Sequence, residues 1–126
     1  VLSIKDSVSA YLRAVQSHEK LSGVFNVAED NYTVGEVAET VKECVEELTD
    51  KKVIINIKNV QDVRNYKVSI EKAKTVLGFH PRYTVRDITK NILSNWEFLQ
   101  DNLSDPKYYN IEICKKVFKE RLRFSR

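Results

Sequence analysis

The 126-residue sequence is poor in the residues that build compact catalytic and metal-binding motifs. Its three glycines, at positions 23, 35 and 78, are scattered, which excludes a glycine-rich loop of the kind that cradles phosphate groups. Its two histidines and two cysteines show no metal-ligand spacing, and two cysteines make no disulfide framework. We therefore predict no catalytic, metal-binding or cofactor-binding residues within this chain.

Long apolar runs and methionine are missing as well. No apolar stretch approaches the roughly 20 residues that span a bilayer, and no secretory signal is recognisable. Cys44 falls on the apolar side of a predicted helix, which favours a reduced core thiol and a cytoplasmic protein. Because the sequence begins with Val1 and contains no Met, we expect a piece of a longer protein.

The positive charge is unevenly distributed along the chain. The net charge is +3, and lysines and arginines concentrate after position 105, whereas the rest of the chain is close to neutral. A basic tail can indicate binding to nucleic acid or to an anionic membrane. Glu112 and Glu120 interrupt the basic run, however. We interpret the tail as a solvated helix face and expect neither nucleic acid nor a membrane as a partner.

The stretch from residue 23 to 48 carries the strongest structural signals. Residues 24–28 (VFNVA) form a short apolar run after a glycine, which predicts a buried strand. Thr33 stands three residues before Glu36, the spacing of a capping box. Apolar residues then recur at helical spacing as far as Leu48. A strand, a polar turn and a capped helix are the first parts of a βαβ unit.

The remaining segments complete an α/β pattern. Residues 53–57 (VIINI) are β-branched and predict a second strand, and residues 1–4 resemble the end of another. Two further helices are predicted, one from the N-cap Asp6 to Ser17 and one from the N-cap Ser69 to Gly78, which would be left-handed. A third is predicted from Thr84 to Leu99, with Trp96 facing the core. A last helix is predicted to begin at Asp105-Pro106. This order predicts an α/β fold: a small, mostly parallel sheet of about three short strands flanked by helices, with a helical C-terminal tail.

The loop between residues 59 and 66 concentrates binding chemistry. Asp62, Arg64 and Tyr66 bring an acid, a planar cation and a phenol into five residues. An arginine fork suits a diphosphate, and a tyrosine hydroxyl can bond to a sugar hydroxyl. The spacing leaves a second interpretation open, in which Asp62 and Arg64 form a surface ion pair and Tyr66 packs against the protein.

Five short segments, taken together, point to a family. They are residues 2–8 (LSIKDSV), 23–27 (GVFNV), 32–38 (YTVGEVA), 62–73 (DVRNYKVSIEKA) and 77–85 (LGFHPRYTV). In this order and spacing the sequence resembles the C-terminal part of the NAD-dependent epimerase/dehydratase family, the extended short-chain dehydrogenases that act on nucleotide sugars. The matching segments span nearly all of residues 1–100.

The resemblance implies that residues 1–103 are a substrate-binding C-terminal lobe and residues 104–126 a basic amphipathic helix. It implies a nucleotide sugar as ligand, with Asn26, Asp62, Arg64 and Tyr66 as substrate-binding residues. The family's N-terminal Rossmann domain, which carries NAD(P), is absent from this chain, so the resemblance implies that the chain alone is inactive. The longer protein would be an epimerase (isomerase), a dehydratase (lyase) or a reductase (oxidoreductase).

Three departures from the family pattern affect these expectations. Ser3 stands where the family usually has His or Tyr, and Ala28 stands where it usually has Gly. Asn59 stands where many members have an arginine that binds the diphosphate. Arg64 is then the better candidate for a phosphate contact. A non-enzymatic α/β interaction module that binds a protein through its apolar tail helix is the alternative, and a homodimer is a further option.

Overall fold

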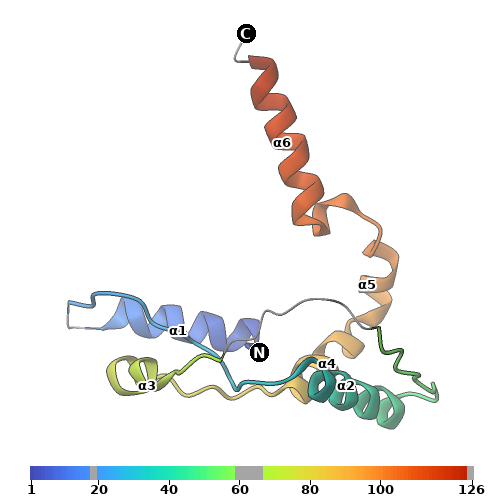
Figure 1. Cartoon of the computed structure of the whole chain (residues 1–126), viewed down its shortest axis with the longest axis horizontal. Coiled ribbons are helices and arrows are strands. Elements are labelled where there is room, and N and C mark those ends of the chain that lie inside the picture. The colour runs from blue at the N-terminus through green and yellow to red at the C-terminus, as the bar shows by residue number, and fades with distance from the viewer. Residues whose placement is uncertain (18–19, 59–66, 125–126) are drawn as a thin grey trace. The chain divides into compact units, whose positions relative to one another are not determined.

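The computed structural model describes residues 1–17, 20–58 and 67–124 (Figure 1). Contacts divide the chain into two compact units, Val1–Leu93 and Ser94–Arg126. The helical elements in the described ranges are α1 (Ile4–Gln16), α2 (Val34–Leu48), α3 (Glu71–Leu77), α4 (Val85–Ser94), α5 (Trp96–Asn102), the 3-10 helix η1 (Pro106–Tyr108) and α6 (Asn110–Phe124). None of these helices is long and apolar enough to cross a membrane.

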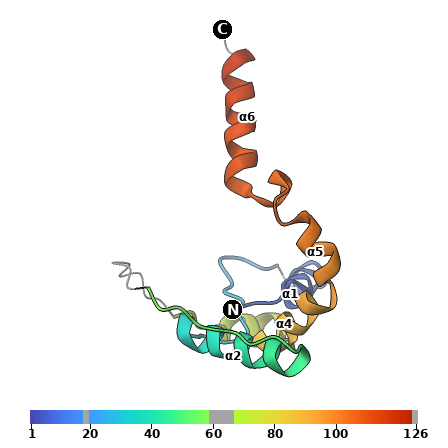
Figure 2. The ribbon, with the colours of Figure 1, turned by 90° about the vertical axis from the view of Figure 1, so that its right-hand side faces the viewer.

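The predicted sheet is absent from the described residues, so the α/β expectation is wrong. Residues 24–28 and 53–57 both run as irregular segments, and Figure 2 shows the second of them leaving the end of α2 without a paired strand. Val24, Ile54 and Ile57 are 80, 83 and 87% exposed. Strand hydrogen bonds run to a neighbouring strand, and no described segment provides that neighbour.

Local side chains occupy backbone groups that a sheet would have paired. The Lys72 ammonium donates to the Val24 carbonyl at 3.1 Å, and the Val53 N–H donates to the Glu46 carboxylate at 3.0 Å. These contacts hold the two apolar segments to neighbouring helices. They do so without burying Val24, which stays largely in solvent.

The first unit has a small core between α1 and α3, which contact each other. Phe79 is completely buried, and its N–H donates to the Ala73 carbonyl at 3.1 Å. Gly78 before it has a φ of 59°, the left-handed conformation predicted for the end of this helix. The residues of this core are Ala10, Ala73 and Phe79, with Leu2, Val27 and Leu77 packed around them.

The start of α1 differs from the prediction. Ser3, and not Asp6, is the N-cap, and its hydroxyl accepts the Asp6 N–H at 3.0 Å. Asp6 lies one turn inside the helix and is 2% exposed. Its carboxylate accepts the backbone N–H groups of Arg82 and Tyr83 at 3.0 and 3.1 Å. Asp6 therefore connects α1 to a segment more than seventy residues away.

The predicted capping box of α2 is confirmed, with both of its reciprocal bonds present. The Thr33 hydroxyl accepts the Glu36 N–H at 3.2 Å, and the Glu36 carboxylate accepts the Thr33 N–H at 2.7 Å. Thr84 and Asp87 repeat this arrangement before α4, as their sequence pattern predicts. Each helix therefore starts at the residue that its cap specifies.

Helices α2 and α4 are linked through their side chains. Cys44 of α2 is fully buried, as predicted, and its Sγ lies 3.9 Å from the Arg86 carbonyl oxygen. The Arg86 guanidinium pairs with the Glu47 carboxylate, with one N–O distance of 3.1 Å. The buried Cys44 thiol and the ion pair between Arg86 and Glu47 thus join the two helices.

Three further helix predictions need correction. Ser69 does not occupy the N-cap of α3: that position is Ile70, and the Ser69 hydroxyl makes only a 3.4 Å bond with the Glu71 N–H. The predicted helix from Thr84 to Leu99 is interrupted at Asn95, between α4 and α5. Trp96 then begins α5 and is 39% exposed, so it is not a core residue of the described chain.

The second unit contains α5, η1 and α6. The predicted last helix begins as the separate turn η1, where Asp105 accepts the Lys107 N–H at 2.9 Å. The chain re-enters helix at Asn110, and η1 and α6 contact each other. The apolar side chains of α6 that the structure describes are largely exposed, namely Ile111, Ile113, Val117 and Phe118.

Candidate functional site

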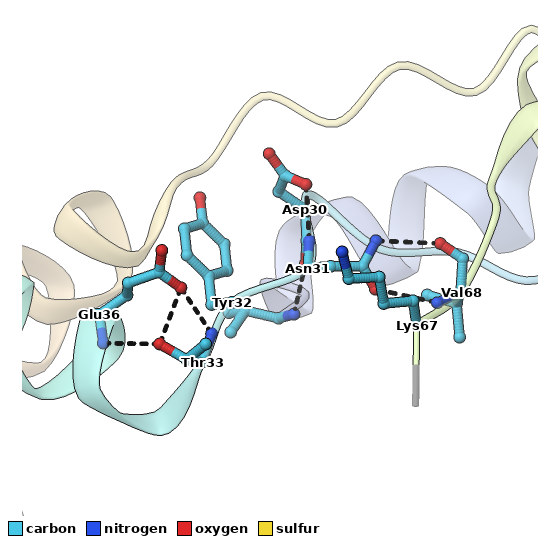
Figure 3. Close-up of a pocket in the computed structure, with 8 residues that line it drawn as sticks. Asp30, Asn31, Tyr32, Thr33, Glu36, Lys67 and Val68 are labelled. Carbon is cyan, nitrogen blue, oxygen red and sulfur yellow. Dashed lines mark hydrogen bonds between the residues drawn. The ribbon is translucent and has the colours of Figure 1, made fainter. Parts of the chain in front are cut away.

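A hollow of about 370 Å³ lies between the turn before α2 and the residues that follow position 66 (Figure 3). Two of the residues around it, Lys67 and Val68, follow in the sequence directly after the segment 59–66, in which the sequence pattern predicts substrate-binding chemistry. The residues around it are Val1, Asp30, Asn31, Tyr32, Thr33, Glu36, Lys67 and Val68.

Asn31 bridges the hollow with its side-chain amide. Its Nδ2 donates to the Val68 carbonyl at 3.0 Å, and its Oδ1 accepts the Val68 N–H at 2.9 Å. Figure 3 shows the two residues facing each other in this arrangement. The amide satisfies both backbone groups of Val68, as a strand neighbour would. Asn31 therefore holds Val68 beside the turn that precedes α2.

Tyr32, another residue around the hollow, stabilises the turn that precedes α2. Its hydroxyl donates to the Glu29 carboxylate at 2.5 Å. This bond to a carboxylate, together with partial burial, raises the pKa of Tyr32 to about 12. The phenol therefore remains a protonated hydrogen-bond donor at neutral pH.

Glu36 is held in its ionised form by the cap of α2. Its carboxylate accepts from both the backbone N–H and the hydroxyl of Thr33, which lowers the pKa of Glu36 below the usual range. The charge of Lys67 adds a smaller effect in the same direction. Since this carboxylate already accepts two bonds from Thr33, we interpret it as a structural support of the wall.

The predicted substrate-binding residues are only partly covered by the structure. Asp62, Arg64 and Tyr66 lie outside the described residues. Asn26 is described and is exposed, in the irregular segment between Gly23 and Ala28. Of the four predicted residues, the structure therefore places Asn26, which lies at the surface.

Sequence reasoning missed two residues that position these segments. The sequence marks Lys72 only as part of a family motif, but its ammonium donates to the carbonyls of Ser22 and Val24 and lies 4.3 Å from the Phe25 ring centroid. It thereby holds the segment that contains Asn26. Asp6 belongs to another motif segment, and its local pattern predicts a cap and not a long-range acceptor. The motifs marked both positions, but the distant backbone groups that they bind are not visible in sequence.

The described residues show neither a metal-ion cluster nor the glycine pattern of a dinucleotide site. They contain no group of three or more histidine, cysteine, aspartate or glutamate residues that could hold a metal ion. The glycines do not fit a dinucleotide site either, because Gly23 and Gly78 take positive φ at separate turns, beside Lys72 and Arg13.

Comparison with known proteins gives one informative match. Over 85 residues, or 67% of the chain, the sequence is 32% identical to UDP-glucuronic acid decarboxylase 3 from Arabidopsis thaliana. The chain spans about a quarter of that relative's length, 24%. No family model matches the sequence, and no solved structure matches it. The chain is thus similar to part of a nucleotide-sugar enzyme.

Proposed function

We propose that the chain is the nucleotide-sugar-binding lobe of an NAD(P)-dependent enzyme of the epimerase/dehydratase type. The observation that carries the proposal is the similarity to UDP-glucuronic acid decarboxylase 3, which agrees with the family resemblance of the five sequence segments. In such an enzyme the cofactor belongs to a preceding domain. This lobe contributes binding energy and orients the substrate.

In this function the main ligand contacts come from the segment 59–66. Arg64 would bind a phosphate of the nucleotide through charge-assisted bonds, while Asp62 and Tyr66 would bind sugar hydroxyls. Asn26 would contact the same ligand from the segment that Lys72 holds in place. We place the enzyme in the cytoplasm, where free cysteines such as Cys44 and Cys114 stay reduced.

Arg64→Ala in the longer protein tests the proposal. We expect nucleotide-sugar affinity to fall about tenfold or more, because a hydrogen bond to a charged group is worth about 1.5–3 kcal/mol. Calorimetric titration with UDP-glucuronic acid and related nucleotide sugars measures it. Lys58→Ala removes a neighbouring positive charge and is the matched control.

The outcome that contradicts the proposal is equally specific. Unchanged affinity together with a lower unfolding midpoint for Arg64→Ala would identify Arg64 as a structural ion-pair residue.

The second candidate function is a protein-interaction module. The observation that favours it is the exposure of Ile111 and Phe118 on α6, at 70 and 63%. Two results together would favour this function over the first. A protein partner would bind α6 and lose that binding on Phe118→Ala, and the longer protein would bind no nucleotide sugar.

A further inference from the structure

Helix α6 carries an apolar face that is open to solvent. Five of its described residues fall within an arc of about 160°, since successive residues of an α-helix are about 100° apart. We call them the α6 apolar face: Ile111, Ile113, Cys114, Val117 and Phe118. Ile113 and Val117, the least exposed of the large ones, are still 41 and 46% exposed. Glu112 and Lys115, which form an ion pair at 2.9 Å, lie outside this arc.

The second unit offers the α6 apolar face no cover of its own. None of the residues of α5 and η1 is buried. Among the described helical elements of this unit, η1 contacts α6 and α5 does not. Phe98 of α5 is itself 63% exposed. Because amphipathic helices normally bury their apolar side, the α6 apolar face requires a partner from outside this unit.

The charges of the second unit are separated along the sequence. Residues 94–113 hold four acids and one lysine, a net charge of −3, whereas residues 114–126 hold six basic residues and one acid, a net charge of +5. Two copies that meet in antiparallel orientation bring the acidic segment of each toward the basic segment of the other, whereas a parallel pair brings like charges together. The unit is therefore complementary in charge to an antiparallel copy of itself.

We propose that the α6 apolar face is the contact surface for a second copy of this chain, whose own α6 packs against it in antiparallel orientation. Such a pair has two-fold symmetry, so each copy contributes the same face, and residues near the axis meet their own counterparts. The face extends from Ile111 to Phe118, and its midpoint lies beside Cys114. The proposal goes beyond the nucleotide-sugar function and does not rest on it.

The area of the α6 apolar face suits a dimer. A large apolar side chain removes about 60–120 Å² from water when it is buried, so the face offers roughly 300–500 Å² of apolar surface per copy. Apolar atoms make up about 60% of a protein interface, so polar neighbours raise this area to roughly 500–800 Å² per copy. Two copies then bury about 1,000–1,600 Å², which overlaps the range of about 1,200–2,000 Å² for stable interfaces.

The oligomeric state of the 126-residue chain is the first test, with Phe118→Ser compared with Lys115→Ser. Both side chains are exposed, but only Phe118 belongs to the α6 apolar face. We expect sedimentation equilibrium to give twice the chain mass of 14.7 kDa. Phe118→Ser should raise the dissociation constant of the dimer at least tenfold, the equivalent of about 1.4 kcal/mol, and Lys115→Ser should leave it unchanged. A monomer at every concentration, or equal constants for the two variants, would overturn the proposal.

Crosslinking through Cys114 gives a second readout that does not depend on stability. Under a mild thiol oxidant, two Cys114 thiols form one disulfide, release two protons and pass two electrons to the oxidant. We expect a covalent dimer on a non-reducing gel, because Cys114 lies beside the two-fold axis and is exposed, whereas Cys44 is buried. In a Cys114→Ser chain, Glu112→Cys places the thiol on the opposite side of α6 and should give no covalent dimer. Equal yields for the two chains would overturn the proposal.

Ile111→Cys in a Cys114→Ser chain tests the orientation of the two helices. In the antiparallel pair the two copies of residue 111 lie about 10 Å apart along the helix axis, at 1.5 Å per residue, so the yield of covalent dimer should be far below that of Cys114. A parallel pair brings the two copies of residue 111 together. A yield equal to that of Cys114 would therefore overturn the antiparallel arrangement.

Discussion

At the scale of single residues, Asp6 connects the start of α1 to the backbone of Arg82 and Tyr83 and leaves Ser3 as the helix cap. Ser3 and Asp6 are separated by three positions, and both are good helix caps, so local rules do not choose between them. The choice comes from Arg82 and Tyr83, whose part-buried N–H groups take a carboxylate as their acceptor. Asp6 is that acceptor, and Ser3 is left as the cap.

Replacing Asp6 should therefore be costly. Asp6→Ala leaves the N–H groups of Arg82 and Tyr83 without their acceptor, and both groups are part-buried, so water can replace some of what is lost. We expect a loss of about 1–3 kcal/mol in the free energy of unfolding, the cost of one fully unsatisfied group, measured by urea denaturation. Asp50→Ala, an exposed acid in a turn of the same unit, is the control. Equal midpoints for the two variants would refute the role given to Asp6.

At the scale of elements, the capped helices were the most predictable part of the chain. The bonds of a capping box join residues three positions apart, so Thr33 and Glu36 can form it without help from distant residues. Thr84 and Asp87 do the same before α4. The two predicted strands failed for the converse reason, since residues 24–28 and 53–57 need partners that their own sequence does not contain.

The contribution of the α2 N-cap to the stability of the chain should be measurable. Thr33→Ala should lower the free energy of unfolding by about 1 kcal/mol, the usual cost of losing an N-cap. Denaturation with urea at neutral pH measures this, with Thr75→Ala in the exposed part of α3 as a comparison. An unchanged midpoint for Thr33→Ala would contradict the assignment of the cap.

Acid should weaken the same cap. The bonds from Thr33 lower the pKa of Glu36 from its ordinary value of 4.5, so the folded chain binds this proton less readily than the unfolded chain. The stabilisation is present above pH 4.5 and is lost as the pH falls through the lower folded-state pKa. Glu36→Gln should therefore reduce the loss of stability between pH 5 and pH 3. Glu39→Gln, on the same helix outside the cap, should not.

At the scale of the whole molecule, the first unit leaves much of its apolar surface uncovered. Among the residues of this unit that the structure describes, the buried apolar ones besides Phe79 are small or medium in size, namely Ala10, Ala28, Cys44, Ala73 and Val85. Large apolar residues such as Ile54 and Val15 stay outside. A lobe with this distribution is expected to gain stability from a covering partner.

The isolated 126-residue chain should bind NAD no better than background. Its three glycines are separated by many residues, so the sequence offers no glycine-rich loop that could meet a phosphate at a helix N-terminus. Calorimetric titration measures this, with the longer protein as the positive control. A micromolar dissociation constant for the isolated chain would show that a cofactor site has been overlooked.

The sequence by itself determined the features whose partners are close along the chain. These are the two capping boxes, the left-handed turn at Gly78 and the apolar spacing that buries Cys44. Only the tertiary structure decided which side of α1 is covered, which acid receives the N–H groups of Arg82 and Tyr83, and whether the apolar segments pair. The physical reason is range: a cap or a helical turn closes within about four residues, whereas burial and strand pairing depend on atoms far along the chain, or on another domain.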